Sequence, residues 1–132
     1  MKAITMEMIR QYNIKKLGFD FAGYIYSKKQ ASFHHLIVPK RNGGKETMQN
    51  GAVLMRDTIH DYIHRIEMID YDIYRYITSQ MIEENVKGYL DPDNMKKIDD
   101  VLTYFEREHC SDRTRKGHPL IKEEYIRKRV KF

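Results

Sequence analysis

The sequence has very little cysteine and no long apolar run. Its 132 residues contain one cysteine, Cys110, which excludes an internal disulfide and a zinc site built from several cysteines. No apolar run approaches the roughly 20 residues of a membrane span. The opening residues MKAITMEMIRQY also lack the apolar core of a signal peptide. We therefore expect a cytoplasmic protein with no membrane partner.

Repeats, low-complexity segments and an evident linker are also absent, so we expect one domain spanning residues 1–132. Hydrophobic residues make up 41% of the chain, which favours a folded protein over a disordered one. The net charge of +5 suits a polyanionic partner. The basic C-terminal segment, which includes EEYIRKRVKF, is consistent with a DNA contact and equally with a solvated helix end. Charge alone therefore leaves the partner open.

The first half of the chain predicts one helix followed by short strands. Thr5 is a suitable helix N-cap and Gly18 a suitable helix end. The predicted elements are a helix over 5–17, strands over 21–27, 32–38 and 51–55, and a loop over 40–50 that turns at Gly43-Gly44. Pro39 ends the second strand because it has no N–H for a ladder.

The second half predicts helices. Between Asp57, a candidate cap, and Met81, apolar residues recur at mostly three- and four-residue steps, and Asp70 interrupts them, which indicates a kink or two helices. Asp91 followed by Pro92 is a strong start signal for a further helix. A last helix is expected to begin near Pro119. The predicted fold class is α+β, with a strand–strand–helix middle and helical extensions.

Histidines are concentrated in the middle of the chain. Four of the six fall between His34 and His64. His60 and His64 are four residues apart on a predicted helix, so both imidazoles project from one face. This spacing can supply two nitrogen ligands to one metal ion, although such a pair is also common on solvated helix surfaces.

The stretch HHLIVPKRNGGKETMQNGAVLMRDTIHDYIH, residues 34–64, resembles the HNH endonuclease family in its cysteine-free variety. The family pattern is a histidine pair, a Gly-Gly loop, an asparagine and then one or two histidines. Here His35 precedes Asn50 by fifteen residues, Asn50 precedes His60 by ten, and His60 precedes His64 by four. The spacing of ten is one longer than is common in the family, which indicates an insertion in the turn before the helix.

The resemblance implies a ββα-metal core over residues 19–69, a helical extension over 70–132, and a set of site residues. His34, His60 and His64 would hold one divalent ion, and imidazole ligands suit zinc or nickel while magnesium or manganese stays open. His35 would be the general base, because an imidazole suits proton abstraction near neutral pH. Asn50 would belong with His35 to the catalytic residues, because it would brace the loop and orient the base without touching the metal. Lys40, Arg41 and Lys45 are candidate phosphate ligands, or equally an ordinary basic loop.

Two functions follow from this reading. The first is a metal-dependent DNA endonuclease, typical of phages and mobile elements, in which the helices also serve a protein partner or a homo-oligomer. The alternative is a non-catalytic nucleic-acid- or protein-binding protein with a structural metal. A purely structural site has no use for His35, which favours the enzyme.

Further residues around this stretch are weaker candidates. Glu67 is a candidate partner for a ligand histidine, Tyr62 is expected to be packed, and His109 and His118 are expected to be incidental. Because both members of the histidine pair must reach one phosphate, we also expect a twist, bulge or strand end at His34-His35.

Overall fold

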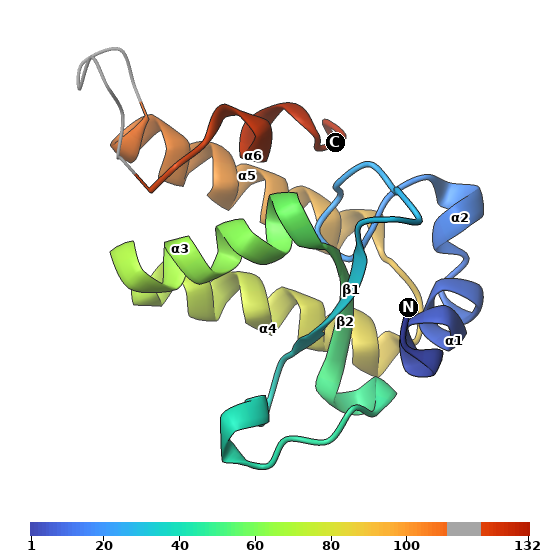
Figure 1. Ribbon diagram of the computed structural model, residues 1–132. Coiled ribbons are helices and arrows are strands. Elements are labelled where there is room, and N and C mark those ends of the chain that lie inside the picture. The colour runs from blue at the N-terminus through green and yellow to red at the C-terminus, as the bar shows by residue number, and fades with distance from the viewer. Residues whose placement is uncertain (111–119) are drawn as a thin grey trace.

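The computed structural model describes residues 1–110 and 120–132, and it has an α+β fold with one two-stranded antiparallel sheet (Figure 1). The helices are α1 (Ala3–Gln11), α2 (Ile14–Leu17), α3 (Asp61–Ile69), α4 (Tyr71–Lys87), α5 (Pro92–His109) and α6 (Glu123–Arg127). The strands are β1 (Ala31–His35) and β2 (Gly51–Met55). Single turns occur at η1 (Lys40–Asn42), η2 (Met48–Asn50) and the π-helical η3 (Arg56–His60). Within the described residues, no helix is both long enough and apolar enough to cross a membrane.

The N-terminal helix differs from its prediction at its start and in its continuity. Thr5 lies buried inside α1 instead of capping it. Asn13, with φ of 57°, takes a left-handed conformation that separates α1 from α2. Gly18 ends α2 in the left-handed conformation, as predicted.

Residues 21–27 do not form the predicted strand; they form a turn built around buried Asp20. One carboxylate oxygen of Asp20 accepts hydrogen bonds from the N–H groups of Ala22 and Tyr24, and the other accepts one from Met55 at the end of β2. These bonds replace a strand ladder, of which only two isolated bridges remain. Burial raises the pKa of the Asp20 carboxyl to about 7.

The sheet is short because the side chain of Asn50 replaces a strand partner just beyond the end of β1. β2 has the predicted bounds, and its register places Ala52 opposite His34 and Gly51 opposite His35. The sequence predicts that the other strand reaches residue 38, but β1 ends at His35. The N–H of Leu36 still bonds to the backbone carbonyl of Asn50, whereas those of Ile37 and Val38 bond to its side-chain oxygen. Gly51 leaves room for the Phe33 ring, since a Cβ on it would lie 2.1 Å from that ring.

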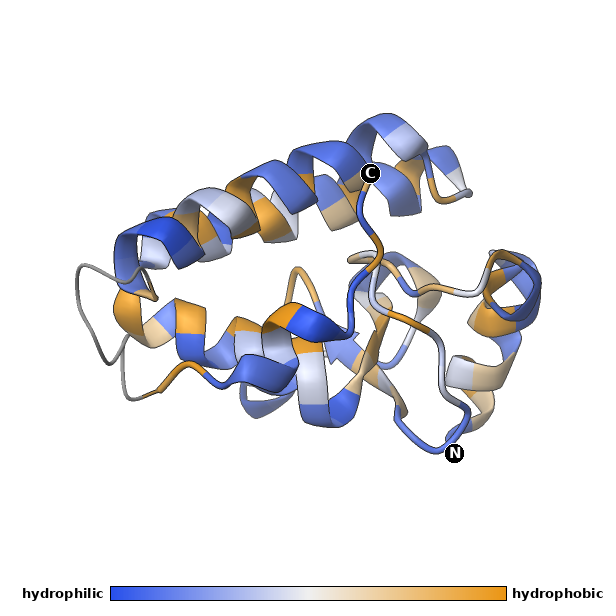
Figure 2. Cartoon of the chain, turned by 90° about the horizontal axis from the view of Figure 1, so that it is seen from above, coloured by the Kyte–Doolittle hydropathy of each residue, from blue (hydrophilic) through white to orange (hydrophobic). Residues whose placement is uncertain are grey.

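Two of the three predicted capping residues in the second half of the chain do begin a helix. Asp70 caps α4 and so divides the predicted helix in two, and Asp91 caps α5 with Pro92 in its first turn. Asp57 caps nothing, because the segment before α3 is the π-helical turn η3. Apolar residues recur along the inner sides of the long helices, as amphipathic packing requires (Figure 2).

The C-terminal segment packs against the rest of the molecule. Arg129 is only 5% exposed, and its guanidinium lies 2.6 Å from Glu106 and 3.1 Å from Asp99, both on α5. Tyr125 stacks on Tyr62 with ring centroids 4.5 Å apart. Neither Arg129 nor Tyr125 is therefore available for the DNA contact that the sequence left open. The predicted helix start near Pro119 lies outside the described residues.

Candidate metal centre

Three histidines from three different elements converge at the end of the sheet. His34 comes from β1, His60 from η3 and His64 from α3. The ring centroids are 5.0 Å apart for His34 and His60, 5.3 Å for His34 and His64, and 5.2 Å for His60 and His64. One ligand atom from each residue lies within 4.8 Å of the other two, so the three side chains are close enough to hold a metal ion.

The chain between β2 and α3 sets the position of this cluster. Strand β2 leads directly into η3, whose π-helical turn is wider and holds more residues than an α-helical turn. This turn lies within the interval of ten residues between Asn50 and His60, which is one residue longer than is common in HNH endonucleases. A π-helical turn can accommodate one additional residue locally. His60 and His64 then lie one helical turn apart and face the buried ring of His34.

The electrostatics of the cluster suit metal binding. His34 is 2% exposed, and its Nε2 has no hydrogen-bond partner among the described residues. Burial, reinforced by the neighbouring histidines, holds the pKa of His34 well below its usual value. Burial also lowers the pKa of His60 to about 4, and His64 and Arg56 add to this effect. Both imidazoles are therefore neutral at pH 7, which is the form that binds a metal, so these donors fit a divalent ion of the zinc type.

His35 lies beside the cluster at the end of β1. Its ring packs edge-on against Phe33, with centroids 5.0 Å apart. Its Nε2 is enclosed and has no hydrogen-bond partner in the described part of the chain, which leaves Nδ1 as the nitrogen able to meet water. His34 and His35 point to opposite faces of a regular ladder, yet both line one pocket because the strand stops there. The expected strand end is therefore confirmed.

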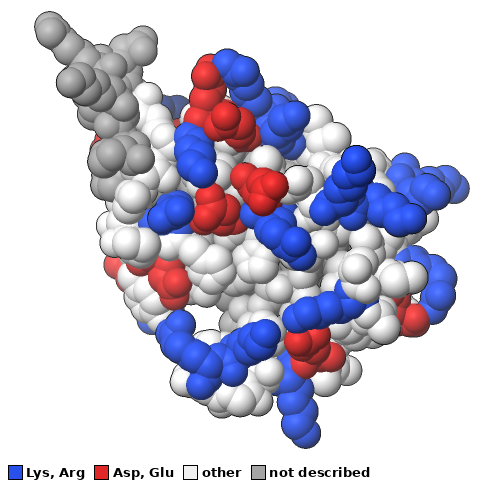
Figure 3. All heavy atoms as spheres, in the orientation of Figure 1, with Lys and Arg blue, Asp and Glu red and all other residues white. Residues whose placement is uncertain are grey.

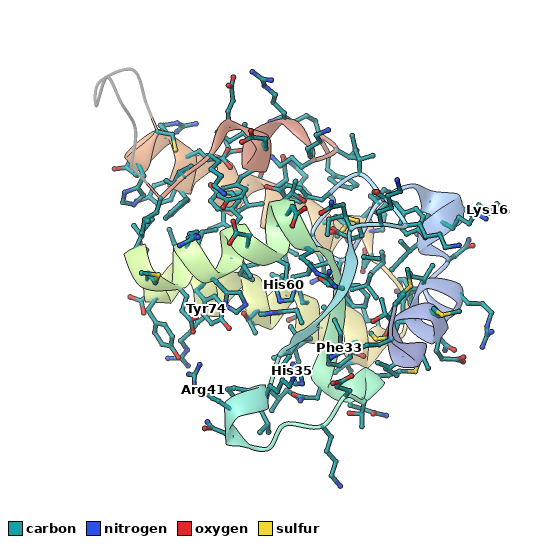
Figure 4. The ribbon with its side chains drawn as sticks, viewed as in Figure 1. Lys16, Phe33, His35, Arg41, His60 and Tyr74 are labelled. Carbon is teal, nitrogen blue, oxygen red and sulfur yellow. The ribbon has the colours of Figure 1, made fainter. Side chains whose placement is uncertain are left out.

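The pocket has a volume of about 230 Å³ and is lined by histidine and by charged residues (Figure 4). Its lining includes His34, His35, His60, His64, Lys40, Arg41, Glu67 and Tyr74. Of the three basic loop residues that the sequence suggested, Lys40 and Arg41 line the pocket. Lys45 is exposed and is not part of the lining.

Asn50 holds the loop between the two strands. Its side-chain oxygen accepts hydrogen bonds from the N–H groups of Ile37 and Val38, and its amide donates to the carbonyls of Val38 and Lys45. All four partners are backbone groups, so Asn50 braces the loop and lies outside the histidine cluster, as expected. Gly44 allows the loop to close, because a Cβ on it would lie 1.9 Å from the Val38 carbonyl oxygen.

The weaker candidates take different positions. Glu67 lines the pocket, and its carboxylate lies 3.6 Å from Nδ1 of His64. Tyr62 is buried and donates a hydrogen bond to Glu106, so it is packed as expected. His109 packs against Phe105 on α5, away from the pocket lining. His118 lies outside the described residues.

Two residues at the site were missed by sequence reasoning. The Oγ of Ser32 lies 2.7 Å from Nδ1 of His60. Strand alternation was an available signal, since Ser32 and His34 share one face of β1. Tyr74 enters the pocket from α4, and its position depends on how α4 packs beside α3, which no local pattern reveals.

The lowered pKa of His60 predicts a pH dependence of stability in the metal-free protein. The unfolded imidazole binds its proton near pH 6.5 and the folded one near pH 4, so the free energy of unfolding falls as the pH falls through this window. Between pH 7 and pH 4, we expect wild type to lose about 3 kcal/mol more than His60→Gln in urea titrations.

The comparison between the two proteins is necessary because Asp20 acts in the opposite direction. Its pKa is raised to about 7, so it favours the folded state as the pH falls, equally in both proteins. Parallel stability profiles for wild type and His60→Gln would contradict the prediction.

Comparisons of the chain with models of known protein families, with curated proteins and with solved structures found no match. The functional conclusion therefore depends on the chemistry of the histidine pocket.

Proposed function

We propose that the protein is a metal-dependent endonuclease of the HNH type, with residues 19–69 as its ββα-metal core, and that it hydrolyses phosphodiester bonds in DNA. The observation that carries the proposal is one pocket in which three clustered histidines are joined by a fourth outside the cluster. A site that only binds a metal needs the three. Hydrolysis also needs a base, and we assign that role to His35 because it lines the same pocket.

His34, His60 and His64 would hold the divalent ion. When bound, that ion would supply Lewis-acid stabilisation of the negative charge that develops on the phosphate and the leaving oxygen. His35 accepts the proton of the attacking water through Nδ1, the nitrogen that is not enclosed. Phe33 limits the orientation of the His35 ring, and Asn50 keeps the loop beyond it in place.

The surroundings of the pocket suit a phosphate backbone. Lys40 and Arg41 line the pocket on the side of the loop, and lysine and arginine side chains stand out around the lower part of the same face (Figure 3). The net charge of +5 adds a general attraction for a polyanion. Contacts of this kind bind phosphates and read little sequence.

The decisive experiment measures metal binding and plasmid cleavage together. Supercoiled plasmid is incubated with wild type and with Mg²⁺, Mn²⁺, Ni²⁺ or Zn²⁺, beside His60→Ala and the matched control His109→Ala. We expect wild type and the control to cleave with at least one metal and to stop when EDTA is added. His60→Ala should lose both the bound ion and cleavage, because one of three ligands is gone.

Two outcomes would contradict the proposal. Equal cleavage by wild type and His60→Ala would show that the pocket is not the nuclease site. Stoichiometric metal binding without cleavage under any condition would favour the alternative function, a binding protein in which the metal is structural.

A further inference from the structure

The hydroxyl of Ser32 lies between a backbone carbonyl and a clustered histidine. Ser32 is on β1, nearly buried, with its Oγ 2.7 Å from the carbonyl oxygen of Leu54 and 2.7 Å from Nδ1 of His60. Both distances are those of good hydrogen bonds. No role was assigned to this residue from the sequence.

The chemistry of the three groups decides the direction of both bonds. A carbonyl oxygen can only accept, and a serine hydroxyl has a single hydrogen. Without that hydrogen between them, the oxygens of Ser32 and Leu54 would face each other with lone pairs at 2.7 Å, which is repulsive. The hydroxyl therefore donates to Leu54, and towards His60 it can only accept.

We propose that Ser32 is a positioning residue that holds His60 with its proton on Nδ1, so that Nε2 presents its lone pair to the metal. A neutral imidazole carries one N–H, so a proton fixed on Nδ1 leaves Nε2 free as the ligand atom. Partners of this kind orient ligand histidines in metal sites, and their loss typically lowers metal affinity 10- to 100-fold. The inference rests on the proposed metal site and adds one residue to it.

The location of Ser32 makes this arrangement rigid. Ser32 pairs with Leu54 in the register of the sheet, so the hydroxyl and the carbonyl are held by the same two paired residues. His60 is carried by η3, which follows directly on Met55, the last residue of β2. The bond thus ties the sheet to the turn that carries His60, and it fixes the rotation of that ring toward His34.

The test compares Ser32→Ala with Ser32→Thr, which keeps the hydroxyl and suits a strand. The control is Ser79→Ala, whose hydroxyl bonds Tyr76 on the exposed face of α4. The proton position on His60 is read by ¹⁵N NMR of the metal-free proteins at neutral pH. Zn²⁺ affinity is measured by calorimetry on the same samples.

We expect wild-type and Ser32→Thr proteins to carry the proton on Nδ1 of His60. Ser32→Ala should lose that preference and bind Zn²⁺ about 10- to 100-fold more weakly, and Ser79→Ala should match wild type. A proton on Nε2 in wild type would overturn the inference, as would an unchanged proton position and affinity in Ser32→Ala. The NMR measurement needs no metal, so it decides the proton position on His60 even if wild type binds no Zn²⁺. Absence of Zn²⁺ binding by wild type would count against the proposed function and not against this proton position.

Discussion

His35→Ala should cleave plasmid about 100- to 10,000-fold more slowly than wild type while binding the divalent ion as tightly, because general-base catalysis contributes a factor of this size. The side chain of His35 is not one of the three that cluster, so its removal leaves all three proposed ligands in place. Its imidazole packs on Phe33 at the pocket wall, and truncation there removes a proton acceptor more than it removes packing. The measurements are single-turnover cleavage and metal calorimetry.

A second variant, His34→Ala, distinguishes the loss of a base from the loss of a metal ligand. His34→Ala changes the adjacent residue in the same strand, and it should lose metal binding and cleavage together, because one of the three clustered rings is gone. His35→Ala should separate the two properties. Loss of metal binding in His35→Ala, or cleavage at the wild-type rate, would remove His35 from the role of base.

Arg129→Ala should lower the free energy of unfolding by about 3–5 kcal/mol, the usual result of removing one partner from a buried ion pair. The guanidinium is almost fully enclosed and contacts Glu106, Asp99 and the hydroxyl of Thr103. Truncation leaves two carboxylates on α5 with little solvent and no cation. Urea titration monitored by circular dichroism measures the change.

The matched control is Arg127→Ala, two residues earlier. Arg127 is exposed, and its ion pair within the described part of the chain is a surface pair with Glu123, so we expect its loss to change stability by less than about 0.5 kcal/mol. Similar effects for the two variants would mean that Arg129 does not hold the C-terminal segment. The larger loss should also weaken metal binding, since Tyr125 in this segment stacks on Tyr62 in α3, the helix that carries His64.

Local patterns in the sequence were sufficient for several elements. Asp91 with Pro92, the capping Asp70 and the terminal Gly18 each act through hydrogen bonds or backbone angles within a few residues, so the helix ends they predict are confirmed. The clustering of His60 with His64 followed from helical periodicity alone, and the α+β fold class from the change of period after β2. Thr5 and Asp57 have the right chemistry for caps but are overruled by packing, because α1 starts earlier and η3 occupies the segment before α3.

The remaining features depend on residues far apart in the chain. Asp20 turns a predicted strand into a loop because its carboxylate meets the backbone of Met55, and Arg129 is buried because α5 offers two carboxylates to it. The same holds at the site. The sequence by itself determined which histidines are candidates and that two of them share a helix face. The family resemblance grouped His34 with these two, and the tertiary structure shows that the three side chains do lie together. Only the tertiary structure decided that Ser32 contacts His60 and that Tyr74 lines the pocket. The physical reason is that spacing along one element follows from backbone geometry, whereas contacts between elements depend on how their buried faces pack.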